Sequence, residues 1–295
     1  YKTATDPGVK FVEAVARLKG GRLLLVGDLM LDEMVRGSAE RLSPDAPVPV
    51  LSIDGESSID RRPGGTGNVA ACLRGLEAEV SIVGLVGDDE AGRQLTSALE
   101  SEGCEIGGIV IDASRPTTVK RSLVGLAQHR HPQKMFRLDI ESRTPASDDV
   151  IERLLESIDA RIDQVDCVCL EDYDKGTCPP ALCRALVERC LARKIPLLVD
   201  PAAIADYSRY AGASLITPNR TEAELAMNRL GGLKTDLGEA VAIATELRTQ
   251  HGFDVVVLTL DRDGAMLATE DGCTHLPTEA KSVYDVTGAG DMVLA

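Results

Sequence analysis

Short apolar runs alternate with amphipathic stretches along almost the whole chain, and this alternation limits the fold more than any other feature. The apolar runs have the length of buried strands and cover residues 23–26, 80–86, 167–170, 195–199, 215–217 and 255–260. The stretches between them have helical periodicity, as in residues 89–102, 150–160, 180–193 and 237–251. Asp236 and Glu239, at the start of the last stretch, have the spacing of a capping box. The pattern predicts an α/β fold with a mostly parallel central sheet and helices on both faces.

Two segments interrupt this alternation. Residues 33–62 contain three prolines among short alternating runs, and residues 105–140 contain strand-like runs at 106–111, 117–123 and 135–138 without a helix between them. Both segments suggest antiparallel strands, because proline is tolerated at sheet edges. We therefore expect a small β-sheet lid, built from about residues 33–62 and 105–140, on one domain that spans residues 1–295.

Charge and composition exclude several kinds of partner. The chain has 32 Lys+Arg against 47 Asp+Glu, a formal net charge of -15, which disfavours nucleic acid. Aromatic residues are only 3% of the chain, too few for a base-stacking surface. The eight cysteines form no C-x-x-C pair of the kind that zinc sites favour. No signal peptide or membrane-length apolar run is visible, so we expect a cytoplasmic protein with neither nucleic-acid nor membrane partners.

A glycine-rich turn near the end of the chain is the strongest chemical signal. Residues 285–291 read Asp-Val-Thr-Gly-Ala-Gly-Asp before a short apolar stretch. Backbone N–H groups of such a turn gather at the positive end of a helix and suit a phosphoryl group. Asp291 is placed to accept a proton from an attacking hydroxyl. The alternative is an ordinary turn into a helix with an acidic cap, since glycine-rich turns are common.

Two further polar segments follow or precede apolar runs. Gly64 and Gly65 would let a ligand approach the backbone, and Asn68 offers both a hydrogen-bond donor and an acceptor. Asp28 or Asp32, just after the first strand, could hold sugar hydroxyls. The structural alternatives are a turn that enters a helix and solvated loop carboxylates.

Asn219 and Glu222 follow the apolar run of residues 215–217 and could orient a magnesium–phosphate complex, although their spacing is also that of a helix cap. All these segments lie at strand–helix junctions, where open α/β sheets place their sites. In this combination the chain resembles the ribokinase (phosphofructokinase-B) family of carbohydrate kinases over nearly its whole length. Residues 64–68 and 285–291 match the two signatures of that family.

The resemblance implies a ribokinase-like fold, ATP-dependent phosphorylation of a sugar, and ATP and Mg²⁺ as cofactors, with K⁺ as a further candidate. Asp291 matches the catalytic base of the family. The other implied roles are the phosphoryl anion hole (Gly288, Ala289, Gly290), sugar binding (Asp32, Gly64, Gly65, Asn68), nucleotide and magnesium binding (Asn219, Glu222, Thr259, Gly264) and a monovalent-cation site (Asp285, Thr287). Where family members often have glycine directly after Thr-Leu, this chain has Asp261.

Residues 27–32, 41–50, 137–139 and 172–176 resemble one branch of the family, which phosphorylates the anomeric hydroxyl of D-glycero-β-D-manno-heptose 7-phosphate for ADP-heptose and lipopolysaccharide synthesis. Lys175, Arg137 and Arg41 are then candidates to bind the sugar phosphate, with exposed or lid-packing cations as the alternative. Ala202 and Ala203 stand where that branch usually has a lysine, so a kinase for another sugar or for a nucleoside is an alternative substrate assignment.

The last expectations concern completeness and assembly. The sequence stops at Ala295, four residues after Asp291, where family members continue through further helices. We therefore expect the C-terminal end of the domain to be missing, and a truncated or inactive ligand-binding member is the alternative to an active kinase. An exposed β lid could also pair with a second copy to form a homodimer.

Overall fold

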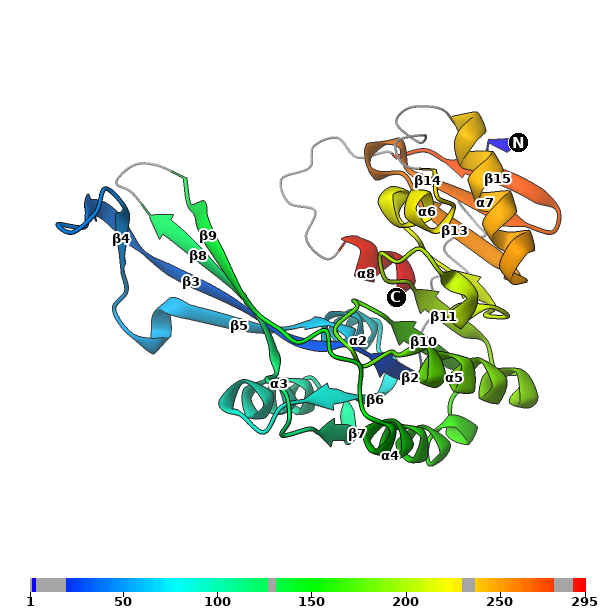
Figure 1. Cartoon of the computed structure of the whole chain (residues 1–295), viewed down its shortest axis with the longest axis horizontal. Helices are drawn as coiled ribbons and strands as arrows, with labels where there is room; N and C mark the ends of the chain where they lie inside the picture. Colours follow the sequence, from blue (N-terminus) through cyan, green and yellow to red (C-terminus); the bar gives the residue numbers. More distant parts are fainter. Residues whose placement is uncertain (1, 4–19, 127–130, 230–236, 279–288) are drawn as a thin grey trace.

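The structure is a computed structural model, and it describes residues 2–3, 20–126, 131–229, 237–278 and 289–295 (Figure 1). Ten of the described strands form one central sheet, in the order β1-β15-β14-β13-β12-β11-β10-β2-β6-β7. In this spatial order, all neighbouring strands between β13 and β7 are parallel. Strand β14 is antiparallel to both β13 and β15, so this end of the sheet is an antiparallel edge. The strands are β1 (Lys2–Thr3), β2 (Arg22–Gly27), β6 (Glu79–Val86), β7 (Glu105–Ile111), β10 (Cys167–Glu171), β11 (Leu197–Asp200), β12 (Leu215–Ile216), β13 (Val255–Thr259), β14 (Ala265–Thr269) and β15 (Gly272–Leu276).

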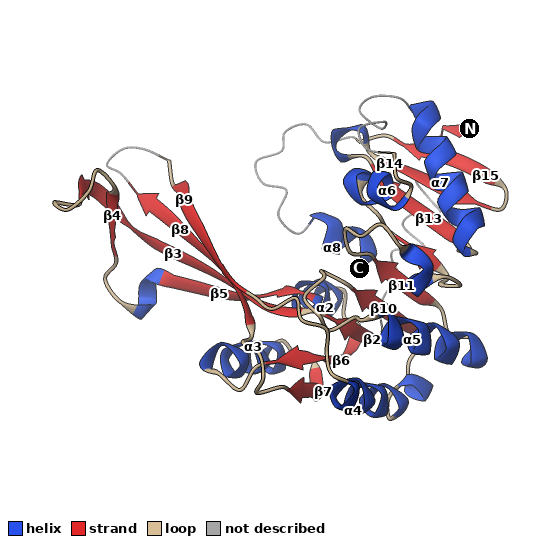
Figure 2. Cartoon of the chain, viewed as in Figure 1, coloured by secondary structure: helices blue, strands red, loops and turns tan. Residues whose placement is uncertain are grey.

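Helices cover both faces of this sheet, which confirms the predicted α/β fold (Figure 2). The helices are α2 (Thr66–Gly75), α3 (Glu90–Ser101), α4 (Asp148–Asp159), α5 (Pro180–Arg193), α6 (Arg220–Ala226), α7 (Leu237–His251) and α8 (Ala289–Leu294), with short 3-10 turns η1 (Glu56–Ser58), η2 (Ile162–Gln164), η3 (Tyr207–Tyr210) and η4 (Asp261–Asp263). Leu24 and Val26 of β2 pack with α4, α5 and α7 on one face. Leu25 packs with α2 and α3 on the other, as alternation along a strand requires.

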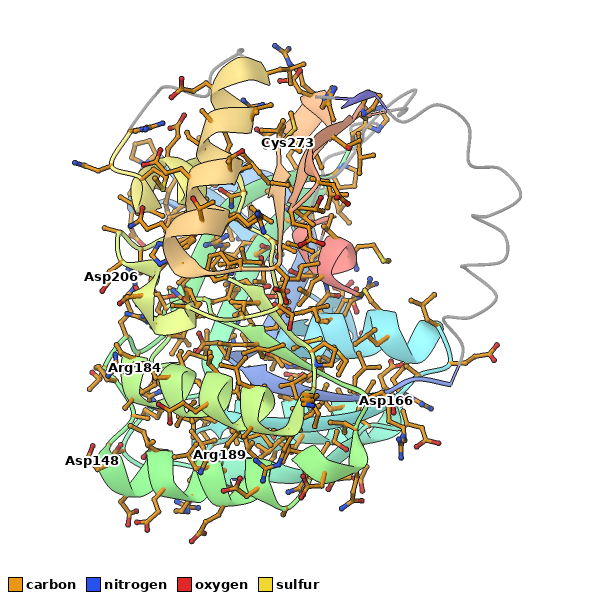
Figure 3. All side chains as sticks on the ribbon, turned by 90° about the vertical axis from the view of Figure 1, so that its right-hand side faces the viewer. Asp148, Asp166, Arg184, Arg189, Asp206 and Cys273 are labelled. Carbon is orange, nitrogen blue, oxygen red and sulfur yellow. The ribbon has the colours of Figure 1, made fainter. Side chains whose placement is uncertain are left out.

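Helices α4 and α5 lie side by side on their face of the sheet. Leu154 of α4 and Leu186 of α5 are fully buried in the shared core. On the solvent side, Arg189 of α5, which is labelled in Figure 3, donates to both carboxylate oxygens of Asp159 of α4, at 2.8 and 3.0 Å. This bidentate pair fixes the two helices at the rim of the core.

A second sheet projects from the body as a lid, visible at the left of Figure 1. It contains β3 (Leu29–Leu42), β4 (Pro49–Ser52), β5 (Ile59–Gly65), β8 (Thr118–Leu126) and β9 (Gln133–Ile140). The long strand β3 pairs with β4, β5 and β8, and β9 forms the outer strand beyond β8. Glu33 of β3 joins three strands, because its carboxylate accepts from Arg61 of β5 at 2.9 Å and from Arg121 of β8 at 2.5 Å.

The expected lid segment of residues 105–140 is wrong at its first strand. Residues Glu105–Ile111 form β7, which pairs with β6 at the edge of the central sheet. Its side chains explain the position: Val110 packs into the core beside α4, whereas Ile109 packs into the core beside α2 and α3. The other two expected strands of the segment lie in the lid as β8 and β9.

Other boundaries are close to those expected. The first lid strand begins at Leu29 and therefore includes Asp32, which the expected segment of residues 33–62 omitted. Helices over residues 180–193 and 237–251 are confirmed, while Asp236 of the expected capping box lies outside the described residues. Among the described helices, none has both the length and the apolar character that crossing a bilayer requires.

Candidate active site

Several acidic side chains meet where strands of the central sheet end. Asp28 directly follows β2, and Glu171 and Asp200 are the last residues of β10 and β11. Strand β2 lies between β6 on one side and β10 on the other. The chain therefore adds β6 and β7 on one side of β2 and later adds β10 and β11 on the opposite side. Such a switch in strand order opens a crevice at the carboxyl ends, which is where α/β sheets bind ligands.

Asp291 lies over this edge of the sheet on α8, which packs against α2 and β11. The side-chain amide of Asn68 donates to its Oδ2 at 2.5 Å, and the Tyr173 hydroxyl donates to its Oδ1 at 2.7 Å. Two neutral donors therefore orient a partly buried carboxylate without neutralising it, as a proton acceptor needs. Ala289 and Gly290 form the start of the same helix, whereas Asp285, Thr287 and Gly288 lie outside the described residues.

The predicted sugar-binding residues meet at the junction of lid and body. Burial raises the pKa of the Asp32 carboxyl, and the neighbouring Lys120 partly opposes that shift. A Cβ on Gly64 would lie 2.6 Å from Oδ2 of Asp32, so only glycine leaves room for this carboxylate. Gly65 has a φ of 56°, and a Cβ there would lie 2.7 Å from the carbonyl oxygen of Asp28.

Asp28, the other candidate acid after the first strand, organises a loop. Its carboxylate accepts the backbone N–H groups of Tyr173, Lys175 and Thr177 at 2.8, 3.1 and 3.1 Å. Because this side chain is only 1% exposed and its oxygens are occupied, it holds the loop after β10 in place. That loop carries Tyr173 to Asp291.

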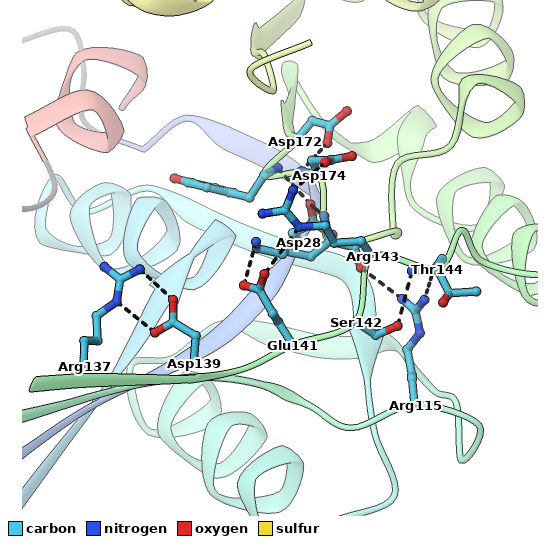
Figure 4. A network of polar contacts seen from close by, with 12 residues as sticks. Asp28, Arg115, Arg137, Asp139, Glu141, Ser142, Arg143, Thr144, Asp172 and Asp174 are labelled. Atoms are coloured by element: carbon cyan, nitrogen blue, oxygen red, sulfur yellow. Dashed lines mark hydrogen bonds and ion pairs between the residues drawn. The ribbon is translucent and has the colours of Figure 1, made fainter.

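The candidate phosphate-binding cations are paired with acids along the lid (Figure 4). Arg137 donates to both oxygens of Asp139 at 2.8 and 2.6 Å, and Lys175 pairs with Glu141 at 2.6 Å. Arg41 does not join them: it lies nine residues beyond Asp32 on β3, which corresponds to roughly 30 Å at about 3.3 Å per residue.

Sequence reasoning missed Lys120 and Tyr173 at this site. Lys120 of β8 lies directly opposite Asp32 of β3, and its ammonium group is 5.4 Å from the centre of the Tyr173 ring. Neither residue belongs to a glycine-rich motif, and only the pairing of β3 with β8 brings Lys120 to Asp32. For Lys120 the alternation of β8 was the available signal, since every second residue of that strand faces the same side. Tyr173 lies within the segment of residues 172–176 that resembles the heptose branch, but the resemblance gave it no role.

The predicted nucleotide-binding residues gather at the end of β13. Asn219 and Glu222 form the capping box of α6, with the Asn219 amide accepting at 3.0 Å and the Glu222 carboxylate at 2.8 Å. Asn219 also bridges to Thr259. The helix-cap interpretation of this pair is thus confirmed, and its place beside the Thr259 loop stays compatible with nucleotide binding.

A cavity of about 330 Å³ opens beside that loop. Its lining is Arg220, Leu237, Ala240, Leu260, Arg262, Asp263, His275, Pro277 and Thr278. Arg220 donates to the carbonyl oxygen of Leu260 at 2.8 Å and to Asp263 at 2.9 Å, so it fixes the loop. Asp261, which replaces a glycine usual in the family, adopts a φ of 53°, and Gly264 has a φ of 92°. Asp261 therefore occupies a left-handed conformation in which glycine is favoured.

A second cavity, of about 210 Å³, lies between the loop that follows β10 and the start of α6. Its lining is Arg143, Asp172, Tyr173, Asp174, Asp200, Pro201, Ala202, Ala203 and Glu222. Burial raises the pKa of Asp200 to about 6 and that of Glu222 to about 7. These carboxyl groups face the region between the nucleotide-side loop and Asp291, where a hard divalent cation would find oxygen ligands.

Comparison with known proteins finds relatives that match almost the whole chain. The chain is 40% identical over 277 residues to "Bifunctional protein HldE" of Helicobacter hepaticus, covering 94% of this chain and 55% of that protein. It is also 40% identical over 286 residues to the protein of the same name from Paramagnetospirillum magneticum, covering 96% of this chain and 56% of that protein. The chain thus spans about half the length of these curated relatives.

Solved structures share the fold at low sequence identity. Phosphofructokinase-2 from Escherichia coli, in its tetrameric inhibited form, superposes with a TM-score of 0.70 at 17% identity over 92% of this chain and 84% of its own. Ribokinase of Arabidopsis thaliana, complexed with ribose and ATP, gives a TM-score of 0.63 at 20% identity over 92% and 83%. Residues 52–295 match the pfkB family of carbohydrate kinases. The chain therefore belongs to the pfkB family of carbohydrate kinases.

Proposed function

We propose that this kinase phosphorylates the anomeric hydroxyl of D-glycero-β-D-manno-heptose 7-phosphate, giving the 1,7-bisphosphate used for ADP-heptose. The observation that carries the proposal is the position of Asp291, held by Asn68 and Tyr173 close enough to Asp32 of the lid strand β3 for its charge to raise the pKa of Asp32. The heptose-branch resemblance of residues 172–176 falls on the loop that delivers Tyr173 and Lys175 to this site.

The reaction follows from these residues. Asp32 and the turn of residues 64–68 hold the sugar at the junction of lid and body. Asp291 takes the proton of the anomeric hydroxyl, whose oxygen attacks the γ-phosphoryl group of ATP in line. The bond between the γ-phosphorus and the bridging oxygen breaks, and ADP leaves. The backbone N–H groups of Ala289 and Gly290, at the start of α8, would donate to the transferring group, and Gly288 matches a further donor position of the family. Asn219 and Glu222 would hold Mg²⁺ on their side of the site, where the ion would supply positive charge to the phosphates.

The phosphate already present on the substrate needs cations near Asp32. Lys120, Arg137 and Lys175 supply them from two lid strands and the loop after β10. Each has an acidic neighbour, so the site is charge-balanced before the substrate arrives: Asp32 for Lys120, Asp139 for Arg137 and Glu141 for Lys175. A dianionic phosphate would draw these side chains from their acidic neighbours.

A substrate panel tests the assignment. ADP formation is measured with heptose 7-phosphate, fructose phosphates, ribose and adenosine as acceptors. We expect the highest kcat/KM with heptose 7-phosphate, and activity confined to unphosphorylated acceptors would reject the proposal. Arg137→Gln should raise the KM for the sugar phosphate, whereas Arg41→Gln, at the far end of β3, should not change it.

One observation favours a second candidate, a kinase for a different sugar or for a nucleoside. Ala202 and Ala203 line the 210 Å³ cavity where the heptose branch usually has a lysine. This leaves a wider and less basic space beside Asp200. The same panel separates the two candidates, because a neutral acceptor gains from the added room and has no need of the missing cation.

We also propose K⁺ as an activating ion of the kinase. Asp285 and Thr287 match the cation positions of the family, and one phosphofructokinase-2 structure from Escherichia coli is a complex with potassium. Replacing KCl with choline chloride should lower kcat.

We propose the lid as a dimer contact, because Phe136 and Leu138 of β9 are 65% and 45% exposed. Phe136→Glu should dissociate the dimer, as measured by light scattering, whereas Leu191→Glu on α5 should not.

A further inference from the structure

Arg143 is the one basic side chain among the described residues that line the 210 Å³ cavity. The acidic residues of the same lining are Asp172, Asp174, Asp200 and Glu222. The lining residues that follow β11, at positions 201–203, carry no charge. Because like charges repel, an anion that enters this cavity is opposed by the carboxylates, and Arg143 is the residue of the lining that can attract it.

The backbone around Arg143 is anchored to the loop that follows β10. Residues 141–147 connect β9 to α4, and the Ala146 N–H donates to the Gly176 carbonyl oxygen at 2.9 Å. A Cβ on Gly176 would overlap the carbonyl oxygen of Thr144, so the two segments can touch only because residue 176 is glycine. Arg143 therefore extends from a fixed point at the edge of the cavity.

The guanidinium group of Arg143, in contrast, is held loosely. The side chain is 65% exposed, and its acidic neighbours lie at 3.4 Å, from Nε to Glu141, and at 3.5 Å, from Nη1 to Asp174 (Figure 4). Charge-assisted hydrogen bonds between nitrogen and oxygen are normally about 2.7–2.9 Å long. Glu141 is also shared, because Lys175 lies 2.6 Å from its other oxygen. The guanidinium group can therefore turn to a stronger anion without losing a strong pair.

The position of the cavity indicates which anion this is. On the side of α6, its lining includes Glu222, whose capping-box partner Asn219 bridges to Thr259 of the nucleotide-side loop. On the side of the loop after β10, it includes Tyr173, whose hydroxyl donates to Asp291 at 2.7 Å. The volume is below the about 300–1,000 Å³ of a pocket for a whole small ligand, so the cavity suits part of one. In-line transfer places the terminal phosphates of a nucleotide between these two sides.

We propose that Arg143 binds the terminal phosphates of the nucleotide in this cavity, turning toward them from Glu141 and Asp174. The inference rests on the proposed function in one respect, that a nucleoside triphosphate is the phosphoryl donor, and it is independent of which sugar is the acceptor. A planar guanidinium group can give two parallel N–H donors to phosphate oxygens. Its charge also offsets the acidic lining and the charge that develops on the transferring group.

Binding of AMP-PNP, an ATP analogue that is not hydrolysed, tests the proposal. The full chain is titrated in a calorimeter with AMP-PNP and Mg²⁺, without sugar. Arg143→Gln should weaken AMP-PNP binding by about 10-fold or more, because a charge-assisted hydrogen bond is lost. AMP lacks the terminal phosphates, so its affinity should be the same in the variant and the wild type. Arg143→Lys keeps the charge without the planar fork and should recover part of the lost affinity.

Arg184→Gln is the matched control, since Arg184 is an exposed arginine of α5 outside the cavity lining (Figure 3). Its AMP-PNP affinity should equal that of the wild type, and circular dichroism checks that each variant folds. Equal AMP-PNP affinity in Arg143→Gln and the wild type would overturn the proposal, as would an equal loss for AMP and AMP-PNP. An Arg143→Gln variant that raises only the KM for the sugar phosphate would overturn it too, because Arg143 would then bind the acceptor.

Failure of the proposed function gives a different result. If heptose 7-phosphate is not phosphorylated but Arg143→Gln still weakens AMP-PNP binding and spares AMP binding, the substrate assignment is rejected and the role of Arg143 is supported.

Discussion

At the scale of single residues, Asp291 owes its position to two neutral donors from distant parts of the chain. Asn68 and Tyr173 fix both oxygens without contributing a positive charge. Asp291→Asn should therefore keep the shape of the site and remove the proton acceptor. We expect kcat to fall by about 10²- to 10⁴-fold in a coupled ADP assay, with sugar binding retained in calorimetry. Turnover near that of the wild type would exclude Asp291 as the base.

Gly64 is constrained by the carboxylate that it faces. An added Cβ would lie 2.6 Å from Oδ2 of Asp32 and force that side chain to move. Gly64→Ala should therefore raise the KM for the sugar substrate, by about 10-fold if one charge-assisted hydrogen bond is lost. Gly75→Ala, at the end of α2 and open to space, is the control and should leave KM unchanged. Equal KM values in both variants would remove Asp32 from the sugar site.

The site residues that were predicted from the sequence lie where a local backbone requirement is visible, and those that were missed do not. Asp291, Asn68 and Gly64 stand in local glycine-rich motifs, where the backbone requirement itself is visible. Tyr173 and Lys120 carry no such requirement. They reach the site because the Asp28 carboxylate organises one loop and because β3 pairs with β8. Contacts between residues so far apart in sequence leave no periodic trace.

At the scale of elements, the lid depends on one buried carboxylate of β3 that accepts hydrogen bonds from side chains of the two neighbouring strands. Glu33 is 5% exposed and accepts from Arg61 and Arg121 on the strands at either side. Glu33→Gln would remove the carboxylate partner of Arg121 and one of the two acidic partners of Arg61, beside Glu56, and cost about 1–3 kcal/mol of unfolding free energy. Urea unfolding measures this loss, and limited trypsin digestion should cut the lid first. Glu40→Gln, exposed on the same strand, should behave as wild type.

Element types were easier to predict than element partners. The periodicity of residues 180–193 and 237–251 gave helices with the observed bounds, because one apolar face fixes the period. Residues 106–111 were predicted as a strand but placed in the wrong sheet. A buried edge strand and a lid strand have similar patterns, and only the packing of Ile109 and Val110 on opposite cores separates them.

At the scale of the whole molecule, the net charge of -15 is compatible with the proposed substrates, ATP and a sugar phosphate, which are both anions. Lys120, Arg137 and Lys175 supply local positive charge. The acidic surplus has another consequence, because several of its carboxyl groups are buried near the sheet edge. Burial raises the pKa of Asp172 and of Asp200 to about 6 and that of Glu222 to about 7.

These raised values set the sign of the pH dependence of stability between about pH 4 and 7. A carboxyl whose pKa is higher in the folded than in the unfolded chain binds protons more tightly when folded, so the free energy of unfolding falls as pH rises. Asp166, whose pKa Arg22 lowers to about 2, titrates below this range. Asp172→Asn keeps an acceptor for Tyr210 but removes one titration, so its Tm relative to wild type should be higher at pH 7.5 than at pH 4.5. Calorimetry in EDTA measures the Tm of variant and wild type at both pH values. Asp166→Asn is the control, and its Tm relative to wild type should be the same at pH 4.5 and pH 7.5. The full change is at most about 3 kcal/mol, since one pKa unit corresponds to about 1.4 kcal/mol. A Tm difference that is equal at the two pH values would mean that Asp172 titrates alike in the folded and unfolded chain.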